Sequence, residues 1–328
     1  MSWNVGLIGL DGHQGQILDG IVQLEHTRLV GIASRNAEAL ERTKSHPAVT
    51  SETHFYSDHR EMLEREKLHI VGICNMNSEH APVLLDGAGA GVHMVSEKPL
   101  VTTLEDLNTV QSAVERSRVT LSMLLTMRFE PAYLAAKALV GQGKIGKPIL
   151  ASAQKSYRLG GRPEWMKHRS TYGGTIPFVG IHALDLIRWI TGQEFTEAFA
   201  YHANIGKPEV KEMEDNATVV VKLEDGGSAS AHIDYLRPTA APTHGDDAVR
   251  VAGSEGVVEV RYGKTTLIDA EGGPREIDLP EPIQCFVNFV ESLEGKTKRL
   301  VPAEDAYRMT EICLKARDAA DTGRPVVL

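Results

Sequence analysis

The stretch that decides the fold of the first half of the chain is Val5-Gly6-Leu7-Ile8-Gly9-Leu10-Asp11-Gly12-His13-Gln14-Gly15. An apolar, strand-like run leads into a glycine-rich turn and then into a segment with helical spacing. A dinucleotide-binding fold needs small residues here, because the turn is tight and the backbone approaches a pyrophosphate at the helix N-terminus. The spacing, G-x-x-G-x-x-G, is one residue longer than the usual pattern, and a tight strand-to-helix turn alone would also use glycine. Its position favours nucleotide binding, and the expected contacts are Gly9, Asp11, Gly12, His13 and Gln14.

Outward from this turn, the first 125 or so residues alternate between short apolar runs and helical segments. This alternation predicts βαβ crossovers and a parallel sheet that is covered on both faces. Continuous apolar runs such as Ile70-Val71-Gly72-Ile73 fit strands that are buried on both faces. The predicted strands are 5–10, 29–33, 54–56, 69–74, 93–96 and 119–125, and the predicted helices are 14–24, 37–44, 59–66, 80–90 and 104–116.

After Met127 the pattern changes to period-two runs separated by glycine turns such as Asp225-Gly226-Gly227. Runs of this kind are typical of antiparallel hairpins. The second half is therefore predicted to be α+β, built on an antiparallel sheet. Its predicted strands are 217–223, 228–235, 249–252 and 257–260, its helices are 131–140, 180–190, 283–293 and 303–321, and 159–174 is expected to be irregular.

Length and composition bound the class of protein. The 328 residues suggest about two domains, and 42% hydrophobic with 24% charged residues excludes a disordered chain, a collagen and a coiled coil. The net charge is 35 − 44 = −9 and there is no dense Lys/Arg run, so we expect no nucleic-acid or membrane partner. No apolar stretch reaches 18 residues and no export signal is recognisable, so the expected location is the cytoplasm.

Cysteine and histidine spacing gives no sign of a metal or disulfide framework. The cysteines are odd in number, far apart and without a CxxC pair, which argues against disulfides and structural zinc. Four histidines of the second half show no ligand spacing either, and no metal is predicted. These residues are Cys74, Cys285 and Cys313, and His168, His202, His232 and His244.

The second predicted strand ends in Ile32-Ala33-Ser34-Arg35-Asn36. Many dinucleotide folds carry an acid here that accepts from the adenosine ribose. Ser34 and Arg35 instead offer a hydroxyl and a cation where a 2′-phosphate would sit, so the cofactor is NAD or NADP with NADP favoured. The alternative is that Ser34 caps the next helix and Arg35 is merely solvated.

A second motif, Glu97-Lys98-Pro99, ends the fifth predicted strand, and strand C-termini of such sheets face the ligand crevice. With this motif the sequence resembles the glucose–fructose oxidoreductase/inositol dehydrogenase (Gfo/Idh/MocA) family over the whole chain. The order and spacing of several motifs carry the resemblance. They are Asn75-Met76-Asn77-Ser78-Glu79-His80 for T-P-N-x-x-H, Glu97-Lys98-Pro99 for E-K-P, Met127-Arg128-Phe129-x-Pro131 for R-F-x-P, Gly180-Ile181-His182-x-x-Asp185 for G-x-H-x-x-D, Asp215-Asn216-Ala217, and Thr322-Gly323-Arg324-Pro325-Val326.

The resemblance implies an α/β architecture: a Rossmann NAD(P)-binding domain over 1–125 and an α+β domain with a large open antiparallel sheet over 126–328. The second domain would bind substrate and mediate oligomerisation. The implied reaction is hydride transfer between a nicotinamide cofactor and a secondary hydroxyl or carbonyl of a sugar, cyclitol or related polyol. Carried over by position, Lys98 contacts nicotinamide ribose and substrate, and His182 transfers the proton. The implied cofactor contacts also include Asn75, Met76, Asn77, His80 and Glu97, and the implied substrate contacts include Arg128, Tyr157, Arg162, Trp165 and His182.

Physical chemistry supports these roles independently. Hydride loss from a carbinol needs a partner for the hydroxyl proton, and a histidine suits that task. The Lys98 ammonium could stabilise the developing alkoxide. His182 and Asp185 share a helix face, so the carboxylate could orient the imidazole or a substrate hydroxyl and is counted with the catalytic residues. The alternative is a core histidine, with Asp185 paired to Arg188.

One position departs from the family pattern. Many members carry an aspartate four residues before the histidine, and this chain has Phe178 there. Two further functions therefore stay open: an NAD-dependent glycosidase-like hydrolase, and a non-catalytic cofactor-binding regulator. The arginines and tryptophan of Tyr157-Arg158-Leu159-Gly160-Gly161-Arg162-Pro163-Glu164-Trp165 suit carboxylate or sugar binding, and equally an exposed ion-pair surface.

The predicted open sheet bears on assembly. An open sheet in the second domain leaves an apolar face that one small helical layer cannot fully cover. Closed symmetric association is the usual way to bury such a face. The chain is therefore expected to form a homodimer or homotetramer.

Overall fold

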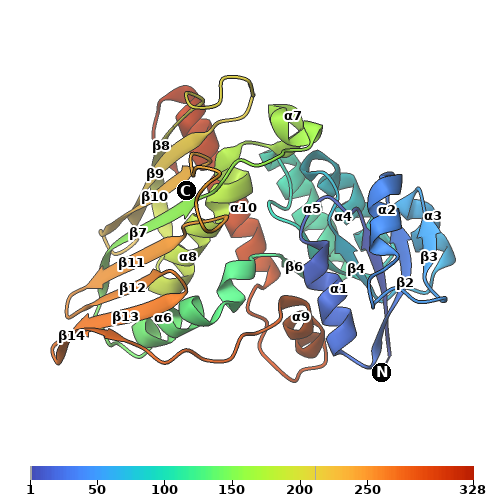
Figure 1. Cartoon of the computed structure of the whole chain (residues 1–328), viewed down its shortest axis with the longest axis horizontal. Helices are drawn as coiled ribbons and strands as arrows, with labels where there is room; N and C mark the ends of the chain where they lie inside the picture. Colours follow the sequence, from blue (N-terminus) through green and yellow to red (C-terminus); the bar gives the residue numbers. More distant parts are fainter. Residues whose placement is uncertain (1, 211) are drawn as a thin grey trace. The chain divides into compact units, whose positions relative to one another are not determined.

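The computed structural model describes residues 2–210 and 212–328, which form two compact units (Figure 1). Unit 1 holds the described residues up to Leu124 together with Ile283–Arg308, and unit 2 holds Leu125–Pro282 and Met309–Leu328. This partition differs from the predicted boundaries at residues 283–308. The reason is that helix α9 (Cys285–Leu293) packs on helix α1 (Gln14–Gln23): the Cys285 thiol lies 3.3 Å from Gln16 Oε1, and Phe286 lies against Gly20.

Unit 1 is built on a six-stranded parallel sheet, as predicted, and its strand order is β3-β2-β1-β4-β5-β6. The chain order reverses between β1 and β4, and in such sheets the crevice at the reversal is where ligands bind. The carboxyl ends of these two strands lead directly to Gly9 and to Asn75. The strands are β1 (Trp3–Ile8), β2 (Thr27–Ala33), β3 (His54–Tyr56), β4 (Ile70–Ile73), β5 (His93–Ser96) and β6 (Leu121–Met123).

Helices α1 to α5 begin where the sequence predicts them, α9 begins two residues later than predicted, and polar caps fix several of the starts. The Asn36 side chain accepts a hydrogen bond from the Ala39 N–H and caps α2, so the alternative role of Ser34 as the cap does not hold. Thr103 caps α5 in the same way. Besides α1 and α9 the helices are α2 (Ala37–Thr43), α3 (His59–Arg65), the 3₁₀ turn η1 (Asn77–Glu79), α4 (His80–Gly89) and α5 (Leu104–Ser117).

Unit 2 is built on a nine-stranded sheet in the order β14-β13-β12-β11-β7-β10-β9-β8-β15. The predicted open sheet is present, but it is mixed, because β7 pairs in parallel with β10 and antiparallel with β11. Strands β7, β8, β13, β14 and β15 lie outside the predicted set. The strands are β7 (Pro148–Ser156), β8 (Phe195–Ala203), β9 (Asn216–Leu223), β10 (Ser228–Asp234), β11 (Ala248–Gly253), β12 (Val257–Arg261), β13 (Lys264–Asp269), β14 (Gly272–Glu276) and β15 (Val326–Val327).

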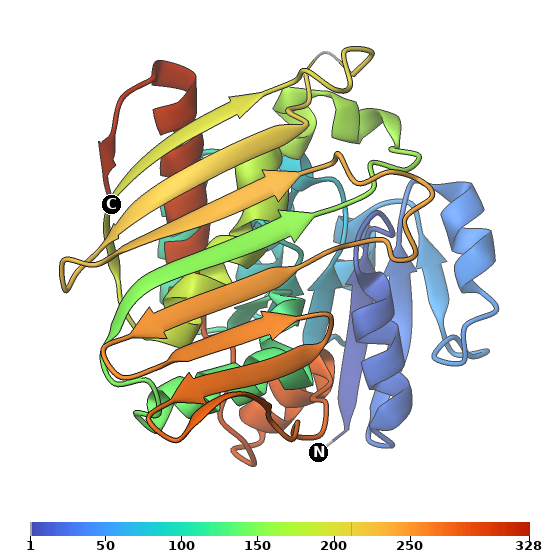
Figure 2. The ribbon, with the colours of Figure 1, turned by 60° about the vertical axis from the view of Figure 1, so that its left-hand side comes forward.

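Helices α6 and α8 cover one face of this sheet (Figure 2). Side chains on the other face stay exposed, Tyr201 at 68% and Val220 at 47%. The segment expected to be irregular, 159–174, contains two short helical turns, because Pro163 starts one of them and Gly173 in the left-handed region ends the other. The helices are η2 (Thr126–Phe129), α6 (Pro131–Gly141), η3 (Glu164–Lys167), α7 (Arg169–Tyr172), the π-helix η4 (Ile176–Gly180), α8 (Ile181–Thr191) and α10 (Ala303–Thr322), which runs from unit 1 into unit 2.

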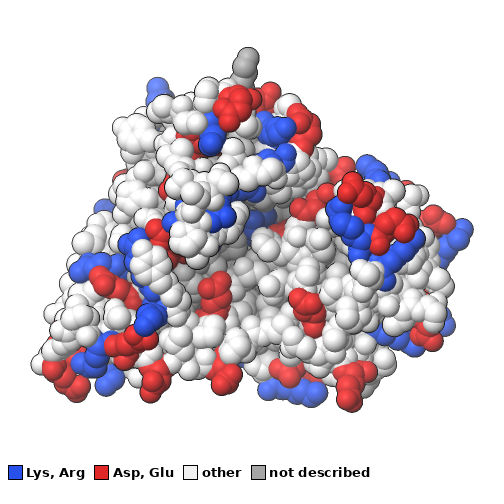
Figure 3. Space-filling model, viewed as in Figure 1, with Lys and Arg blue, Asp and Glu red and all other residues white. Residues whose placement is uncertain are grey.

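The charged side chains of the surface are of both signs. On the face drawn in Figure 3, acidic and basic side chains are interspersed. Within the described residues, no helix combines the length and the apolar character that crossing a membrane requires.

Candidate functional site

The glycine turn after β1 is shaped by two close approaches. Gly9 has a φ of +80°, and a Cβ there would lie 2.3 Å from the backbone nitrogen of Asn75. A Cβ on Gly12 would lie 2.5 Å from Glu97 Oε1. A side chain at Gly9 would displace the backbone of the turn after β4, and one at Gly12 would displace the Glu97 side chain. The turn is therefore held against the two strand ends that carry the other predicted cofactor contacts.

Glu97, the acid of the E-K-P motif, anchors this turn. Its Oε1 accepts hydrogen bonds from the backbone N–H of His13 and from His13 Nδ1, the latter at 2.6 Å. Burial by itself raises the pKa of the Glu97 carboxyl, but the charge and hydrogen bonds of His13, with the Lys98 ammonium, lower it to about 2. This geometry assigns Glu97 to holding the turn, whereas the sequence suggested a cofactor contact.

The His80 side chain likewise links two segments of the backbone. The side chain is fully buried, with Nδ1 2.9 Å from the Pro99 carbonyl oxygen and Nε2 2.9 Å from the Asn75 carbonyl oxygen. Burial lowers the pKa of this imidazole. His80 thus joins the turn after β4 to the segment after β5, and it offers no surface for the cofactor contact expected of it.

Asn75, Met76 and Asn77 form the turn after β4, opposite Gly9. Asn75 and Asn77 are buried, and the amide oxygen Oδ1 of Asn75 is buried without a hydrogen-bond partner among the described residues. A buried amide oxygen ordinarily has a partner. A hydroxyl of a bound ribose would supply one, so this turn fits a nucleotide.

The end of β2 places Ser34 and Arg35 differently. Ser34 is buried, and its Oγ accepts a hydrogen bond from the Asn36 N–H at 3.1 Å. The Arg35 side chain is 81% exposed and its Nη1 lies 3.4 Å from Glu79 Oε1. Burial and the charge of Glu79 raise the pKa of Asp11. The Arg35 guanidinium thus already faces the Glu79 carboxylate, which a 2′-phosphate would have to displace.

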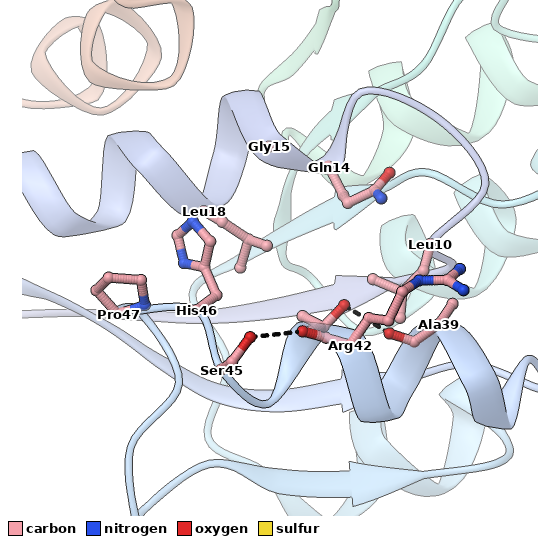
Figure 4. A pocket seen from close by; sticks show the side chains of 10 residues that line it. Leu10, Gln14, Gly15, Leu18, Ala39, Arg42, Ser45, His46 and Pro47 are labelled. Atoms are coloured by element: carbon pink, nitrogen blue, oxygen red, sulfur yellow. Dashed lines mark hydrogen bonds between the residues drawn. The ribbon is translucent and has the colours of Figure 1, made fainter.

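A cavity of about 400 Å³ opens between α1 and α2, beside the glycine turn (Figure 4). Arg42 and His46 line it, and each has an acidic neighbour: Arg42 pairs with Glu38, and His46 Nε2 lies 3.1 Å from Asp19. The cavity is lined by Leu10, Gln14, Gly15, Leu18, Ala39, Arg42, Thr43, Ser45, His46 and Pro47. It adjoins the predicted pyrophosphate turn on its α2 side.

Lys98 follows directly after Glu97 at the carboxyl end of β5. Its backbone N–H donates to Glu97 Oε2 at 3.1 Å, and its side chain is buried. The same carboxylate thus binds both the glycine turn and the backbone of the lysine. A buried ammonium at a strand end is the placement that the sequence predicts for a group acting on cofactor and substrate.

In unit 2, His182 is buried in the first turn of α8, where it follows the π-helix η4. Asp185, three residues on, is bound to Arg128: Nε donates to Oδ2 at 2.9 Å and Nη2 donates to Oδ1 at 2.5 Å. Arg188 pairs with Glu194 instead. Both oxygens of Asp185 therefore accept hydrogen bonds from the buried Arg128.

Lys155 lies outside the site residues that the sequence predicts. It lies on the buried side of β7, where its Nζ bonds to Asp247, lies 3.1 Å from Met127 Sδ and stands 4.6 Å from the centre of the Tyr157 ring. Burial lowers the pKa of the Lys155 ammonium, while Asp247 and Glu130 oppose the shift. The available signal was the alternation Ala151, Ala153, Lys155, which puts a lysine on an apolar face once β7 is recognised as a strand.

Phe178 occupies the position where the family usually has an aspartate. Its ring meets Trp165 and Tyr172 edge to face, with centroids 6.2 and 6.0 Å apart. Tyr172 in turn donates to the buried carboxylate of Glu214. The phenyl ring therefore packs against Trp165, a predicted substrate residue, and helps to hold it in the segment 159–174, which also carries Arg162.

Comparison with known proteins follows the same division of the chain. Residues 3–125 match the oxidoreductase family with NAD-binding Rossmann fold, Gfo/Idh/MocA, and residues 133–259 match a C-terminal domain of that family. The structure of a putative oxidoreductase from Thermotoga maritima superposes with a TM-score of 0.94 at 39% identity, covering 99% of this chain and 100% of that one.

Two curated enzymes are more distant. The NAD⁺-dependent scyllo-inositol 2-dehydrogenase of Bacillus subtilis is 26% identical over 83% of this chain and 81% of its own length. The 1,5-anhydro-D-fructose reductase of Ensifer adhaerens is 25% identical over 97% of this chain and 96% of its own.

Proposed function

Since this chain belongs to the Gfo/Idh/MocA family of NAD-binding oxidoreductases, we propose that it transfers a hydride between a nicotinamide cofactor and a secondary hydroxyl or carbonyl of a sugar, cyclitol or related polyol. Relatives named for inositol dehydrogenation and anhydrofructose reduction support this substrate class. The observation that carries the proposal is the E-K-P segment at the end of β5, where Glu97 fixes the glycine turn and the backbone of Lys98 together.

The residues of unit 1 would hold the cofactor. The glycine turn and the N-terminus of α1 would receive the pyrophosphate, and Asn75 Oδ1 would accept from a ribose hydroxyl. The bound nicotinamide would supply the hydride acceptor or donor. Lys98 would stabilise the negative charge that develops on the substrate oxygen.

His182 would move the proton. In the oxidative direction its imidazole accepts the proton of the substrate hydroxyl, and in the reductive direction it returns that proton. Arg128 and Asp185 would act as positioning residues, because their buried pair fixes α8 one turn after His182.

The finer cofactor preference is also a proposal: the protein binds NADP(H) at least as well as NAD(H). Arg35 at the end of β2 is exposed and can reach a 2′-phosphate, and Ser34 adds a hydroxyl beside it. Glu79 opposes this preference, because it faces the same guanidinium.

A dehydrogenase screen tests the function. The full chain is incubated with polyols, aldoses and cyclitols and either NAD⁺ or NADP⁺, and reduced cofactor is followed by its absorbance. We expect turnover with at least one secondary alcohol. Release of the aryl group from aryl glycosides without net cofactor reduction would favour the hydrolase, and cofactor binding without any turnover would favour the regulator.

A further inference from the structure

Two arginines of the segment 157–165, Arg158 and Arg162, have a buried side-chain nitrogen without a partner among the described residues. Arg158 and Arg162 form no ion pair among the described residues, although the chain carries a net charge of −9. In both side chains the unpartnered nitrogen is Nε. Within the described part of the chain, the one hydrogen bond of the Arg162 side chain joins Nη1 to Met166 Sδ at 3.6 Å.

Trp165 adds a third donor of the same kind. Its indole Nε1 is also buried without a partner, while its ring is held by Phe178. Leaving a buried donor unpaired costs free energy, more so when the donor is charged. Three such donors within eight residues point to an acceptor that comes from outside the chain.

The surroundings of these donors are aromatic and positive. The Arg162 guanidinium lies 4.8 Å from the centre of the Tyr235 ring, and the Tyr157 and His244 rings lie 5.1 Å apart. The backbone N–H of Arg158 donates to the His244 carbonyl at 3.0 Å. Burial lowers the pKa of His244, and Arg162 and Arg158 lower it further, so both guanidinium groups act on one imidazole.

Each neighbouring carboxylate pairs with other cations through its Oδ2, while the Oδ1 of Asp246 and of Asp247 is buried without a hydrogen-bond partner among the described residues. Asp247 binds Lys155, and Asp246 faces Arg237 and Arg261. The planar fork of an arginine matches the two oxygens of a carboxylate or of a phosphate. An oxyanion is thus the acceptor that the three donors and their net charge fit.

We propose that Arg158, Arg162 and Trp165 bind an oxyanion on the substrate, so that this protein acts on an anionic polyol, a sugar acid or a sugar phosphate. The inference rests on the proposed function and narrows its substrate class. Tyr235 and Tyr157 would form apolar walls beside the charged group, and Phe178 would hold the tryptophan in place.

Calorimetric titration of the full chain in the presence of NADH tests the binding. The probes are D-glucuronate and D-galacturonate, their neutral partners D-glucose and D-galactose, and glucose 6-phosphate. We expect at least one anionic probe to bind at least tenfold more tightly than its neutral partner. Tighter binding of the uronates assigns a carboxylate, and tighter binding of glucose 6-phosphate assigns a phosphate.

Variants locate the site. Arg162→Met should weaken binding of the preferred anion by about 10- to 100-fold, the range for hydrogen bonds to a charged group. Arg162→Lys should restore part of the loss, and Trp165→Phe, which keeps the ring but removes the N–H, should weaken binding by a few-fold. Arg250→Gln, on an exposed arginine paired with Glu259, is the matched control and should change nothing.

The outcomes separate this inference from the function on which it rests. Failure of every anion to bind, or equal weakening of neutral and anionic probes by Arg162→Met, overturns the anion site. Cofactor reduction with neutral polyols alongside either result keeps the oxidoreductase. Arg162-dependent anion binding without any cofactor reduction supports the site and refutes the oxidoreductase.

Discussion

The Arg128 guanidinium and the Asp185 carboxylate form a buried bidentate pair that joins η2 to α8, with bonds of 2.9 and 2.5 Å between residues 57 apart in sequence. Both side chains are at most 2% exposed. Asp185 lies one helical turn after His182, so the pair fixes the helix that carries the proposed proton carrier. The carboxylate that the sequence predicts beside the imidazole thus also holds the helix.

Breaking this pair should unfold the protein more readily. Asp185→Asn leaves a buried guanidinium without its counter-charge, and such losses cost about 3–5 kcal/mol. Chemical denaturation measures the change. Glu259→Gln, which breaks the exposed pair with Arg250, is the control and should cost about 0–1 kcal/mol. A loss at Asp185 as small as that of the control would contradict a structural role.

Lys98 and His182 should serve turnover more than folding. Removing one positioned acid–base group costs about 10²–10⁴-fold in rate, so Lys98→Met and His182→Ala should lose that much in kcat/KM on the best substrate. Thermal midpoints should stay close to that of the wild type. Lys98→Met should also weaken cofactor binding, whereas His182→Ala should not. Activity of His182→Ala within a few-fold of wild type would place the proton elsewhere.

Arg35 and Glu79 should set the cofactor preference together. Arg35→Ala removes the cation offered to the 2′-phosphate and should weaken NADPH binding about tenfold, with little effect on NADH. Glu79→Gln frees the guanidinium and should tighten NADPH binding. Fluorescence titration measures both constants, with Arg60→Gln as an exposed control on α3. Tighter NADH binding by the wild type, with no effect of Arg35→Ala, would refute the preference.

Glu97 should make the free energy of unfolding decrease as the pH falls below about 4.5. Its pKa is about 2 in the folded protein against 4.5 ordinarily, so its stabilisation is complete above about pH 4.5 and is lost as the pH falls towards 2. Between pH 7 and pH 3 the loss is about 2 kcal/mol. Glu97→Gln should therefore show a shallower fall than the wild type in urea titrations at those two pH values, whereas the exposed Glu64→Gln should follow the wild type. Parallel curves for Glu97→Gln and wild type would exclude the linkage.

The open face of the unit 2 sheet should mediate self-association. Phe199 and Tyr201 meet edge to face at 4.8 Å on β8, and Val220 pairs with Phe199 from β9. Light scattering should give two or four times the 35.8 kDa chain mass. Val220→Glu should lower that mass, and Tyr262→Glu, in an exposed turn, should not. A wild-type mass of one chain at micromolar concentration would reject the prediction.

Local sequence was sufficient to predict most of unit 1. Its central strands, such as β1 and β4, are buried on both faces and therefore read as apolar runs, and its turns are marked by glycine and by capping residues such as Asn36. The E-K-P segment and the glycine turn were identified separately. That Glu97 binds the backbone of His13, 84 residues away, became visible only in the fold.

Which residues pair in long-range contacts could not be predicted from the sequence. Spacing put His182 and Asp185 on one helix face, but it gave no sign that Arg128, 57 residues earlier, would bind the Asp185 carboxylate. Lys155 could be recognised as buried only after β7 was placed between β10 and β11, and α9 joined unit 1 through contacts with α1. Periodicity records which side of an element is apolar. Which element covers that side, and which buried charge finds which partner, is decided by tertiary packing, because those contacts join residues whose spacing in the chain carries no signal.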